Sequence, residues 1–214
     1  MIVLPVLLMS VVVHEVAHAQ VAFWEGDDTA SRLGRITLNP LSHLDPMGSV
    51  IVPILLYLLP GSLLFGWAKP VPINPGNFRD RKWGEIRVSL AGIAANLTLA
   101  VLSVLALVVL LKLPAGLGGE SPVFGILGQA AYFALYINLI LAFFNLIPLP
   151  PLDGSHVLFH LLPTRLGLRY RELGRYGIGI LMLLVFVFPD AIQLLLWPVD
   201  ALLGLADRFL GWVV

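Results

Sequence analysis

The sequence contains no cysteine, which excludes disulfide bridges, zinc sites built on thiolates and a cysteine nucleophile. Charged residues make up only 12% of the chain, about half of the roughly 25% that soluble domains carry. The formal net charge is +0, so no excess of positive charge favours binding to nucleic acid. Hydrophobic residues, in contrast, make up 58%. These proportions predict an all-α polytopic membrane protein whose surroundings are the lipid bilayer.

Long apolar stretches predict the membrane helices. A bilayer core about 30 Å thick needs about 20 apolar residues in helical form. Residues 1–24, 88–111 and 121–147 meet this requirement. We expect about five membrane helices in a single domain of residues 1–214, with a core in 1–160 and C-terminal helices in 164–214. The number of crossings after residue 175 stays open, because 176–189 is short for an independent span.

Residues 46–68 are uncharged but interrupted by prolines and glycines, which favours a segment that dips into the membrane and returns. A re-entrant path would put eleven of the 13 Lys and Arg residues on one face. Only Lys112 and Arg208 are left out of that count. Because basic loops concentrate on the cytoplasmic side, the first helix is then expected to run from outside to the cytoplasm.

The first predicted helix carries His14, Glu15 and His18 in the pattern H-E-x-x-H. On an α-helix, positions four apart lie on one face, so both imidazoles can bind one Zn²⁺. Glu15 points to a neighbouring face, within reach of an attacking water, which is the place of a general base. Buried in an apolar run, these groups would be costly without partners, and a metal supplies the partner.

A second polar cluster, from Asn145 to Gly154, follows the helix predicted for 121–147. Its prolines end that helix and leave an irregular segment at the membrane boundary. If 46–68 is re-entrant, the first helix and 121–147 run in the same direction, so Asp153 can meet the H-E-x-x-H residues at the same depth. The charges of Zn²⁺ and of the ionised Asp153 and Glu15 side chains would also add up to zero. Helix capping is the alternative role of Asp153.

Three other histidines are rival candidates. His156 and His160 are also four positions apart, but no acid accompanies them at the second position. Hydrogen bonding around the site is the interpretation that we favour for this pair. His43 lies two residues before Asp45 and is expected to be a loop residue.

Together the two motifs resemble the site-2 protease family of intramembrane zinc metalloproteases, in its compact bacterial and archaeal branch without a PDZ domain. The resemblance covers roughly residues 8–160. It is carried by H-E-V-A-H at 14–18, G-R-I-T-L-N-P at 34–40, H-L-D-P-M-G at 43–48, G-W-A-K-P-V-P at 66–72 and N-L-I-P-L-P-P-L-D-G at 145–154. One departure is Ile93 after Ala91-Gly92, where the family often has proline before a nearby asparagine, here Asn96.

The resemblance implies one Zn²⁺ per chain, held by His14, His18 and Asp153. It implies that Glu15 is the catalytic base and that Asn145 holds the substrate carbonyl or oxyanion. The expected reaction is hydrolysis of peptide bonds in transmembrane protein substrates, in a prokaryotic plasma membrane, with the active site nearer the cytoplasm. Separately from the resemblance, the alternation of apolar residues with prolines at 66–74 predicts a short extended segment that pairs with the unwound substrate as an added strand. A plain loop is the alternative. The sequence leaves the oligomeric state undetermined.

Three alternatives remain at this point. A membrane zinc protease of the prenyl-protein type also uses H-E-x-x-H, but usually takes its third ligand from a downstream Glu rather than from an Asp like Asp153. A non-proteolytic zinc-binding protein or transporter would need the metal ligands but not Glu15. A degenerate protease acting as a scaffold is disfavoured by the intact Glu15.

Overall fold

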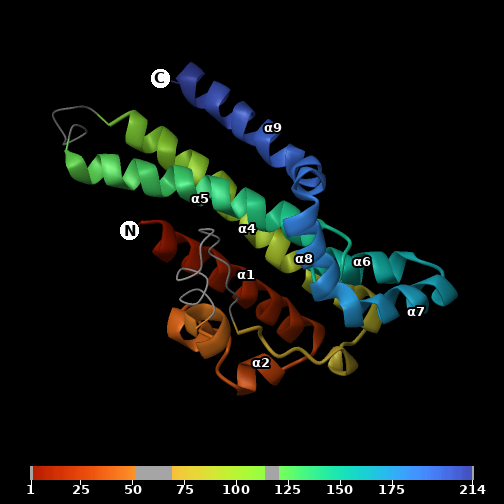
Figure 1. Cartoon of the computed structure of the whole chain (residues 1–214). Coiled ribbons are helices and arrows are strands. Elements are labelled where there is room, and N and C mark those ends of the chain that lie inside the picture. Colours follow the sequence, from red (N-terminus) through yellow and green to blue (C-terminus); the bar gives the residue numbers. More distant parts are fainter. Residues whose placement is uncertain (1, 52–68, 114–120, 214) are drawn as a thin grey trace.

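The computed structural model describes residues 2–51, 69–113 and 121–213 and is helical throughout its regular elements (Figure 1). Three helices, called the long helices below, are both long and apolar enough to cross a membrane: α1 (Val3–Glu25), α4 (Arg81–Leu111) and α5 (Pro122–Leu146). The others are α2 (Thr29–Arg32), η1 (Pro40–His43), η2 (Pro46–Ile51), η3 (Pro75–Asn77), α6 (Asp153–Leu161), α7 (Thr164–Glu172), η5 (Leu173–Tyr176), α8 (Gly177–Val187) and α9 (Pro189–Val213).

The three long helices coincide with the apolar stretches 1–24, 88–111 and 121–147, and each is long and apolar enough to cross a membrane. α4 starts earlier than its apolar stretch, because Asp80 caps it by accepting a hydrogen bond from the Trp83 N–H. The expected count of about five spans is not confirmed. In the described part of the chain there are three candidate spans, or four if the helices on either side of a 91° bend before Pro189 count as one.

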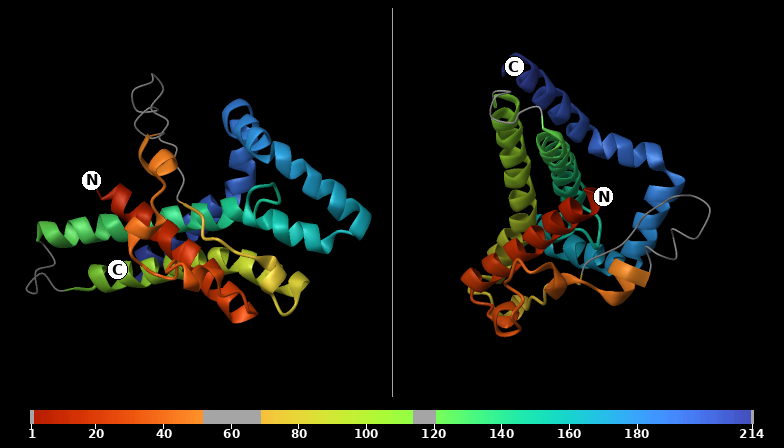
Figure 2. Two further views of the ribbon diagram at one scale, coloured as in Figure 1. Left: turned by 90° about the horizontal axis from the view of Figure 1, so that it is seen from below. Right: turned by 90° about the vertical axis from the view of Figure 1, so that its left-hand side faces the viewer.

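The long helices pack side by side, with α4 antiparallel to both α1 and α5 (Figures 1 and 2). α1 and α5 therefore run in the same direction and end at the same end of the bundle, as expected from the charge distribution. A hydrogen bond of 2.9 Å from Asn138 of α5 to the hydroxyl of Ser10 ties these two helices together. Farther along, α4 and α5 bury leucines against α9.

Residues 69–77 lie across the C-terminal end of α1 and are held there by polar contacts. The Lys69 N–H donates to the His43 carbonyl, and Arg35 donates to the Lys69 carbonyl. At the other end of the segment, Asp27 accepts hydrogen bonds from the Asn74 backbone and the Asn77 side chain. The segment thus has a defined position although residues 69–74 belong to no helix or strand.

No strand is assigned to residues 69–74, which are the described part of the extended segment expected at 66–74. The prolines at positions 70 and 72 have no N–H to donate, which removes ladder hydrogen bonds there. The segment predicted to re-enter the membrane, 46–68, lies outside the described residues from position 52 onward. Its beginning forms η2, a single turn of π-helix.

Candidate metal centre

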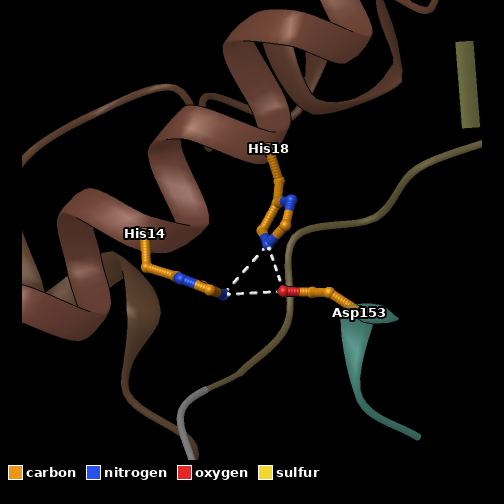
Figure 3. Close-up of side chains that lie close together, drawn as sticks. All are labelled: His14, His18 and Asp153. Carbon is orange, nitrogen blue, oxygen red and sulfur yellow. Dashed lines mark hydrogen bonds and ion pairs between the residues drawn. The ribbon is translucent and has the colours of Figure 1, made fainter. Parts of the chain in front are cut away.

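The two histidines of α1 lie one turn apart on the same face and are both buried, each with 7% of its surface exposed. Their rings meet edge to face, with centroids 4.5 Å apart. The Nε2 atoms of His14 and His18 are 3.0 Å apart (Figure 3). Two ring nitrogens directed at one point are the arrangement that helical i, i+4 spacing predicts for a pair of metal ligands.

Asp153 reaches the same point from the first turn of α6. α5 ends at Leu146, and the proline-containing turn that follows brings the chain back across the end of the bundle. Gly154 allows this turn to pack closely, since a Cβ atom there would collide with the Leu146 carbonyl. The Asp153 Oδ2 atom lies 3.3 Å from Nε2 of both His14 and His18.

The charge environment stabilises the ionised form of the Asp153 carboxyl. Burial by itself raises the pKa of Asp153, but the close contacts with the His14 and His18 side chains outweigh burial and hold the pKa well below its usual range. A carboxylate that keeps its charge at such a buried position has the protonation state that a metal ligand requires.

Distances in this group match a zinc ion. The three donor atoms form a triangle with sides of 3.0, 3.3 and 3.3 Å. Zinc bonds of about 2.0–2.1 Å in a tetrahedron give separations between ligand atoms of about 3.3 Å. Two imidazole nitrogens and one carboxylate oxygen are also a donor set that zinc accepts, and a fourth position is left open for water or substrate. These residues therefore fit a catalytic zinc site.

Helix α4 packs against the rings of both histidines. The Nδ1 atom of His18 lies 2.7 Å from the Val88 carbonyl, which fixes the proton on Nδ1 and leaves Nε2 free to bind metal. Gly92 faces His14 and His18, and a Cβ atom at this position would collide with both rings. The missing side chain at Gly92 therefore lets α4 approach the metal site.

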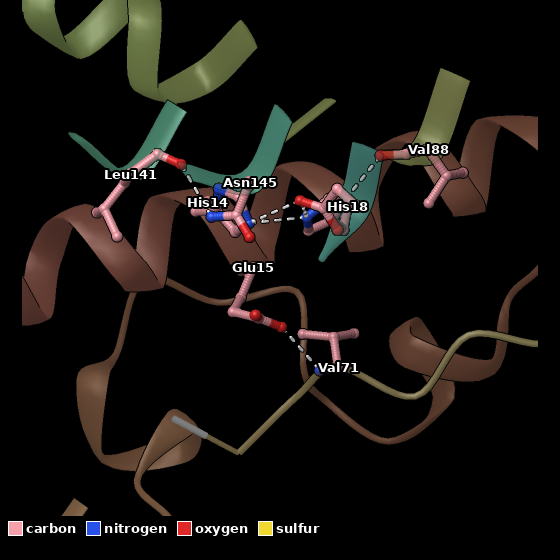
Figure 4. A network of polar contacts seen from close by, with 8 residues as sticks. His14, Glu15, His18, Val71, Val88, Leu141 and Asn145 are labelled. Carbon is pink, nitrogen blue, oxygen red and sulfur yellow. Dashed lines mark hydrogen bonds and ion pairs between the residues drawn. The ribbon is translucent and has the colours of Figure 1, made fainter. Parts of the chain in front are cut away.

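Glu15 lies on the neighbouring face of α1 and points into the same cavity. Its Oε2 atom accepts a 2.9 Å hydrogen bond from the Val71 N–H (Figure 4). The cavity has a volume of about 350 Å³. Its lining residues are His14, Glu15, His18, Pro70, Val71, Ile73, Pro75, Phe78, Glu85, Val88, Ser89, Asn145, Pro151, Asp153 and His156. One space thus connects the metal triad, a carboxylate and the segment 69–77.

Asn145 lines this cavity from the last turn of α5, beside His14 (Figure 4). Its Nδ2 atom donates to the Leu141 carbonyl at 2.9 Å, one turn earlier on the same helix. An amide nitrogen carries two hydrogens, so this bond fixes the side chain and leaves a second N–H.

The three rival histidines do not join the group of His14, His18 and Asp153. His160 lies 2.8 Å from the Glu85 carboxylate, which links the end of α6 to α4, and His156 lines the cavity without joining the triad. His43 is fully buried, and its Nε2 atom lies 2.9 Å from the Thr37 carbonyl, so it belongs to the loop. Asp153 is not the N-cap of α6, because that place is taken by Leu152.

Three contributors to the site carry no motif of their own: the Val88 carbonyl, the Val71 N–H and Gly92. Backbone groups are the same in every residue, so no side-chain pattern could reveal the first two. Gly92 could have been found from the sequence, since a glycine inside a membrane helix often marks a place where two helices approach closely.

Comparison with known proteins agrees with this geometry. The model of peptidase family M50 matches residues 116–187, which include Asn145 and Asp153. "Putative zinc metalloprotease YwhC" of Bacillus subtilis is 39% identical over 194 residues, which are 90% of this chain and 82% of that protein. "Putative zinc metalloprotease Rip2" of Mycolicibacterium smegmatis is 35% identical over 147 residues, which are 69% of this chain and 52% of that protein.

Rip2 of Mycobacterium tuberculosis is 32% identical over the same length, so the chain spans about half of the Rip2 proteins. No solved structure matches the chain. The likeness to YwhC extends over most of both chains, and the family model matches the turn that carries Asp153. The chain therefore belongs to peptidase family M50, the site-2 proteases.

Proposed function

We propose that the protein is an intramembrane zinc metalloendopeptidase that hydrolyses peptide bonds of transmembrane proteins. The observation that carries the proposal is the triangle of His14, His18 and Asp153, with sides of 3.0–3.3 Å, beside the Glu15 carboxylate. One zinc ion per chain fits this triangle. Three protein ligands and an adjacent carboxylate are the parts that metal-assisted hydrolysis requires.

In this proposal Glu15 is the general base. When bound, zinc would acidify a water molecule in its open position and polarise the scissile carbonyl. Glu15 accepts the proton of the attacking water and later delivers it to the leaving amine. The hydrogen bond from the Val71 N–H holds one oxygen of this carboxylate, so the other oxygen is left to take the proton.

Asn145 would stabilise negative charge on the carbonyl oxygen of the substrate. Its bond to the Leu141 carbonyl holds the amide at the cavity wall, and the second N–H is available to the oxyanion. A single such donor is typically worth roughly 3 kcal/mol of barrier lowering.

The substrate peptide would lie along residues 69–73. Pro70, Val71 and Ile73 line the cavity next to Glu15, and hydrogen bonds to Lys69 and Asn74 hold the segment at both ends. A helical substrate hides its peptide bonds and must be unwound, and a fixed extended segment offers the unwound chain a partner for backbone hydrogen bonds.

The membrane setting follows from the same features. We place the protein in a prokaryotic plasma membrane as a single multi-pass domain, with the active site nearer the cytoplasm. Positively charged loops at the end of the bundle that carries Asp153 support this orientation.

A single experiment tests the proposal. The detergent-purified chain is assayed for bound zinc and for cleavage of a model transmembrane substrate. Glu15→Gln should retain zinc and lose cleavage by roughly 10²- to 10⁴-fold, as removal of a general base does. Asp153→Ala should lose zinc as well as cleavage.

Full cleavage by Glu15→Gln would disprove the mechanism. Zinc binding by the wild-type chain with no cleavage of any transmembrane substrate would favour a metal carrier or scaffold, neither of which needs Glu15.

A further inference from the structure

Three polar side chains are buried between α1, α4 and α5, deeper in the bundle than the triad. They are Ser10, Asn96 and Asn138, with exposed fractions of 3%, 0% and 1%. None of them lines the cavity at Glu15. Burying an amide among apolar membrane helices costs free energy unless the amide is hydrogen-bonded. These side chains are therefore expected to have hydrogen-bond partners.

The packing of α1 against α4 puts these residues next to His14. His18 contacts the Val88 carbonyl, and Gly92, one turn farther along α4, faces the rings of both His18 and His14, including His14 Nδ1. Because the helices are antiparallel, continuing this register by one turn predicts that Ser10 lies near Asn96.

α5 contributes Asn138 to the same level of the bundle. The Nδ2 atom of Asn138 donates to the Ser10 hydroxyl at 2.9 Å and to the Ala134 carbonyl at 2.8 Å. Three helices therefore bring polar groups together one turn beyond His14.

The unpaired atoms at this level are complementary. In the described part of the chain, the buried atoms without a hydrogen-bond partner include His14 Nδ1, both amide atoms of Asn96 and Asn138 Oδ1. If His14 binds metal through Nε2, its Nδ1 carries a proton and is a donor. The set then holds two donors, His14 Nδ1 and Asn96 Nδ2, and two acceptors, Asn96 Oδ1 and Asn138 Oδ1.

We infer that Asn96 is a positioning residue for the metal site. Its Oδ1 accepts the proton of His14 Nδ1, and its Nδ2 donates to Asn138 Oδ1, in each case through one bridging water. The resulting chain of hydrogen bonds runs from His14 through Asn96 and Asn138 to Ser10. It gives His14 the support that the Val88 carbonyl gives His18. The inference rests on the proposed function, in which His14 is a zinc ligand.

Asn96→Leu tests this role in the full-length, detergent-purified chain. Leucine has a similar size but offers no acceptor, so zinc affinity, measured by competition with a chelator, should fall by roughly 10- to 100-fold. Thermal stability of the metal-free protein should change little, because His14 needs an acceptor at Nδ1 chiefly when its Nε2 holds the metal. A merely structural role of Asn96 predicts a loss of thermal stability with the zinc affinity unchanged.

Two further variants complete the design. Asn96→Asp keeps an acceptor for His14 Nδ1 and should retain zinc better than Asn96→Leu. Asn138→Leu interrupts the chain one step farther away. It should weaken zinc binding less, and its effect should not add to that of Asn96→Leu, because both act through His14.

Ser103→Ala is the matched control, since Ser103 is a buried polar residue of the same helix whose hydroxyl bonds only its own backbone, at Leu99. It should bind zinc as the wild type does. Wild-type zinc affinity in Asn96→Leu, or a loss of metal-free stability in parallel with affinity, would overturn the inference. If His14→Ala bound zinc as tightly as the wild type, the proposed function itself would fail.

Discussion

At the scale of single residues, the proposed metal site depends as much on a missing side chain as on the proposed ligands. Gly92 leaves just enough room for the rings of His14 and His18 against α4. The neighbouring Val88 carbonyl then lies within 2.7 Å of His18 Nδ1. If α4 lay farther from α1, the Val88 carbonyl could not fix the ring of His18. Gly92 therefore accounts both for the close approach of α4 and for the orientation of the His18 ring.

We therefore predict that Gly92→Ala weakens zinc binding by roughly 10- to 100-fold, the range typical for loss of support behind a metal ligand. The added methyl group forces the rings or α4 to move. Zinc content after dialysis against a chelator measures the effect. Gly125→Ala on α5 is the control, because a Cβ atom there meets nothing within 4 Å. Equal zinc retention by both variants would contradict this account of Gly92.

At the scale of elements, Asp27 is the residue that joins the loop after α1 to the segment 69–77. It is fully buried and accepts hydrogen bonds from Thr29, Asn74 and Asn77. Burial alone raises the pKa of Asp27, but these hydrogen bonds outweigh it and lower the pKa. Since the folded pKa lies below the unfolded one, the stabilisation is present above the unfolded pKa and is lost as the pH falls through the folded value.

Asp27→Asn should accordingly cost about 1–3 kcal/mol of stability at neutral pH, because buried donors lose an acceptor. The difference in melting temperature between the wild type and the variant should persist down to about pH 4 and shrink only in stronger acid. Asp28→Asn is the control, since Asp28 is more exposed and pairs with Arg32 at the surface. A difference that vanished already near pH 6 would be inconsistent with a lowered pKa.

The segment 69–77 itself can be tested for a role in substrate binding. Replacement of Lys69–Ile73 by glycine and serine should leave the triad and zinc binding intact, because none of the three ligands lies in this segment. Cleavage of a transmembrane substrate should fall, since the segment no longer presents a fixed edge beside Glu15. Unchanged cleavage would rule out strand addition at this segment.

These elements also show what sequence alone could predict. The long helices follow from uncharged stretches, and His14, His18 and Asp153 follow from residue types at recognisable spacing. Val71 could not be found in this way, because its contribution is a backbone N–H placed by contacts more than 40 residues away in sequence, such as that between Asp27 and Asn74. The expected strand at 66–74 rested on alternating apolar residues and prolines, a pattern that is equally compatible with an extended segment held by side chains.

At the scale of the whole molecule, the orientation in the membrane links the charge distribution to the site. The Lys69 N–H donates to the His43 carbonyl, so these two residues lie on the same side of the membrane. Asp153 contacts His14 and His18 of α1, and α1 and α5 terminate at the same end of the bundle (Figure 1). Lys112 follows α4 and lies at the opposite end. The charge distribution and the position of the site therefore favour the same orientation.

The absence of native cysteine allows a direct test of this orientation, because every introduced thiol is the only one. In intact cells, a membrane-impermeant maleimide should label Lys112→Cys but not Arg32→Cys or Arg169→Cys. After permeabilisation all three should react, since all three side chains are exposed and lie outside the three helices that are each long and apolar enough to cross a membrane. Labelling of Arg32→Cys and Lys112→Cys from the same side would contradict the orientation. Labelling of Arg169→Cys in intact cells would mean that the arginines of α7 lie outside, away from the face where the basic loops are expected.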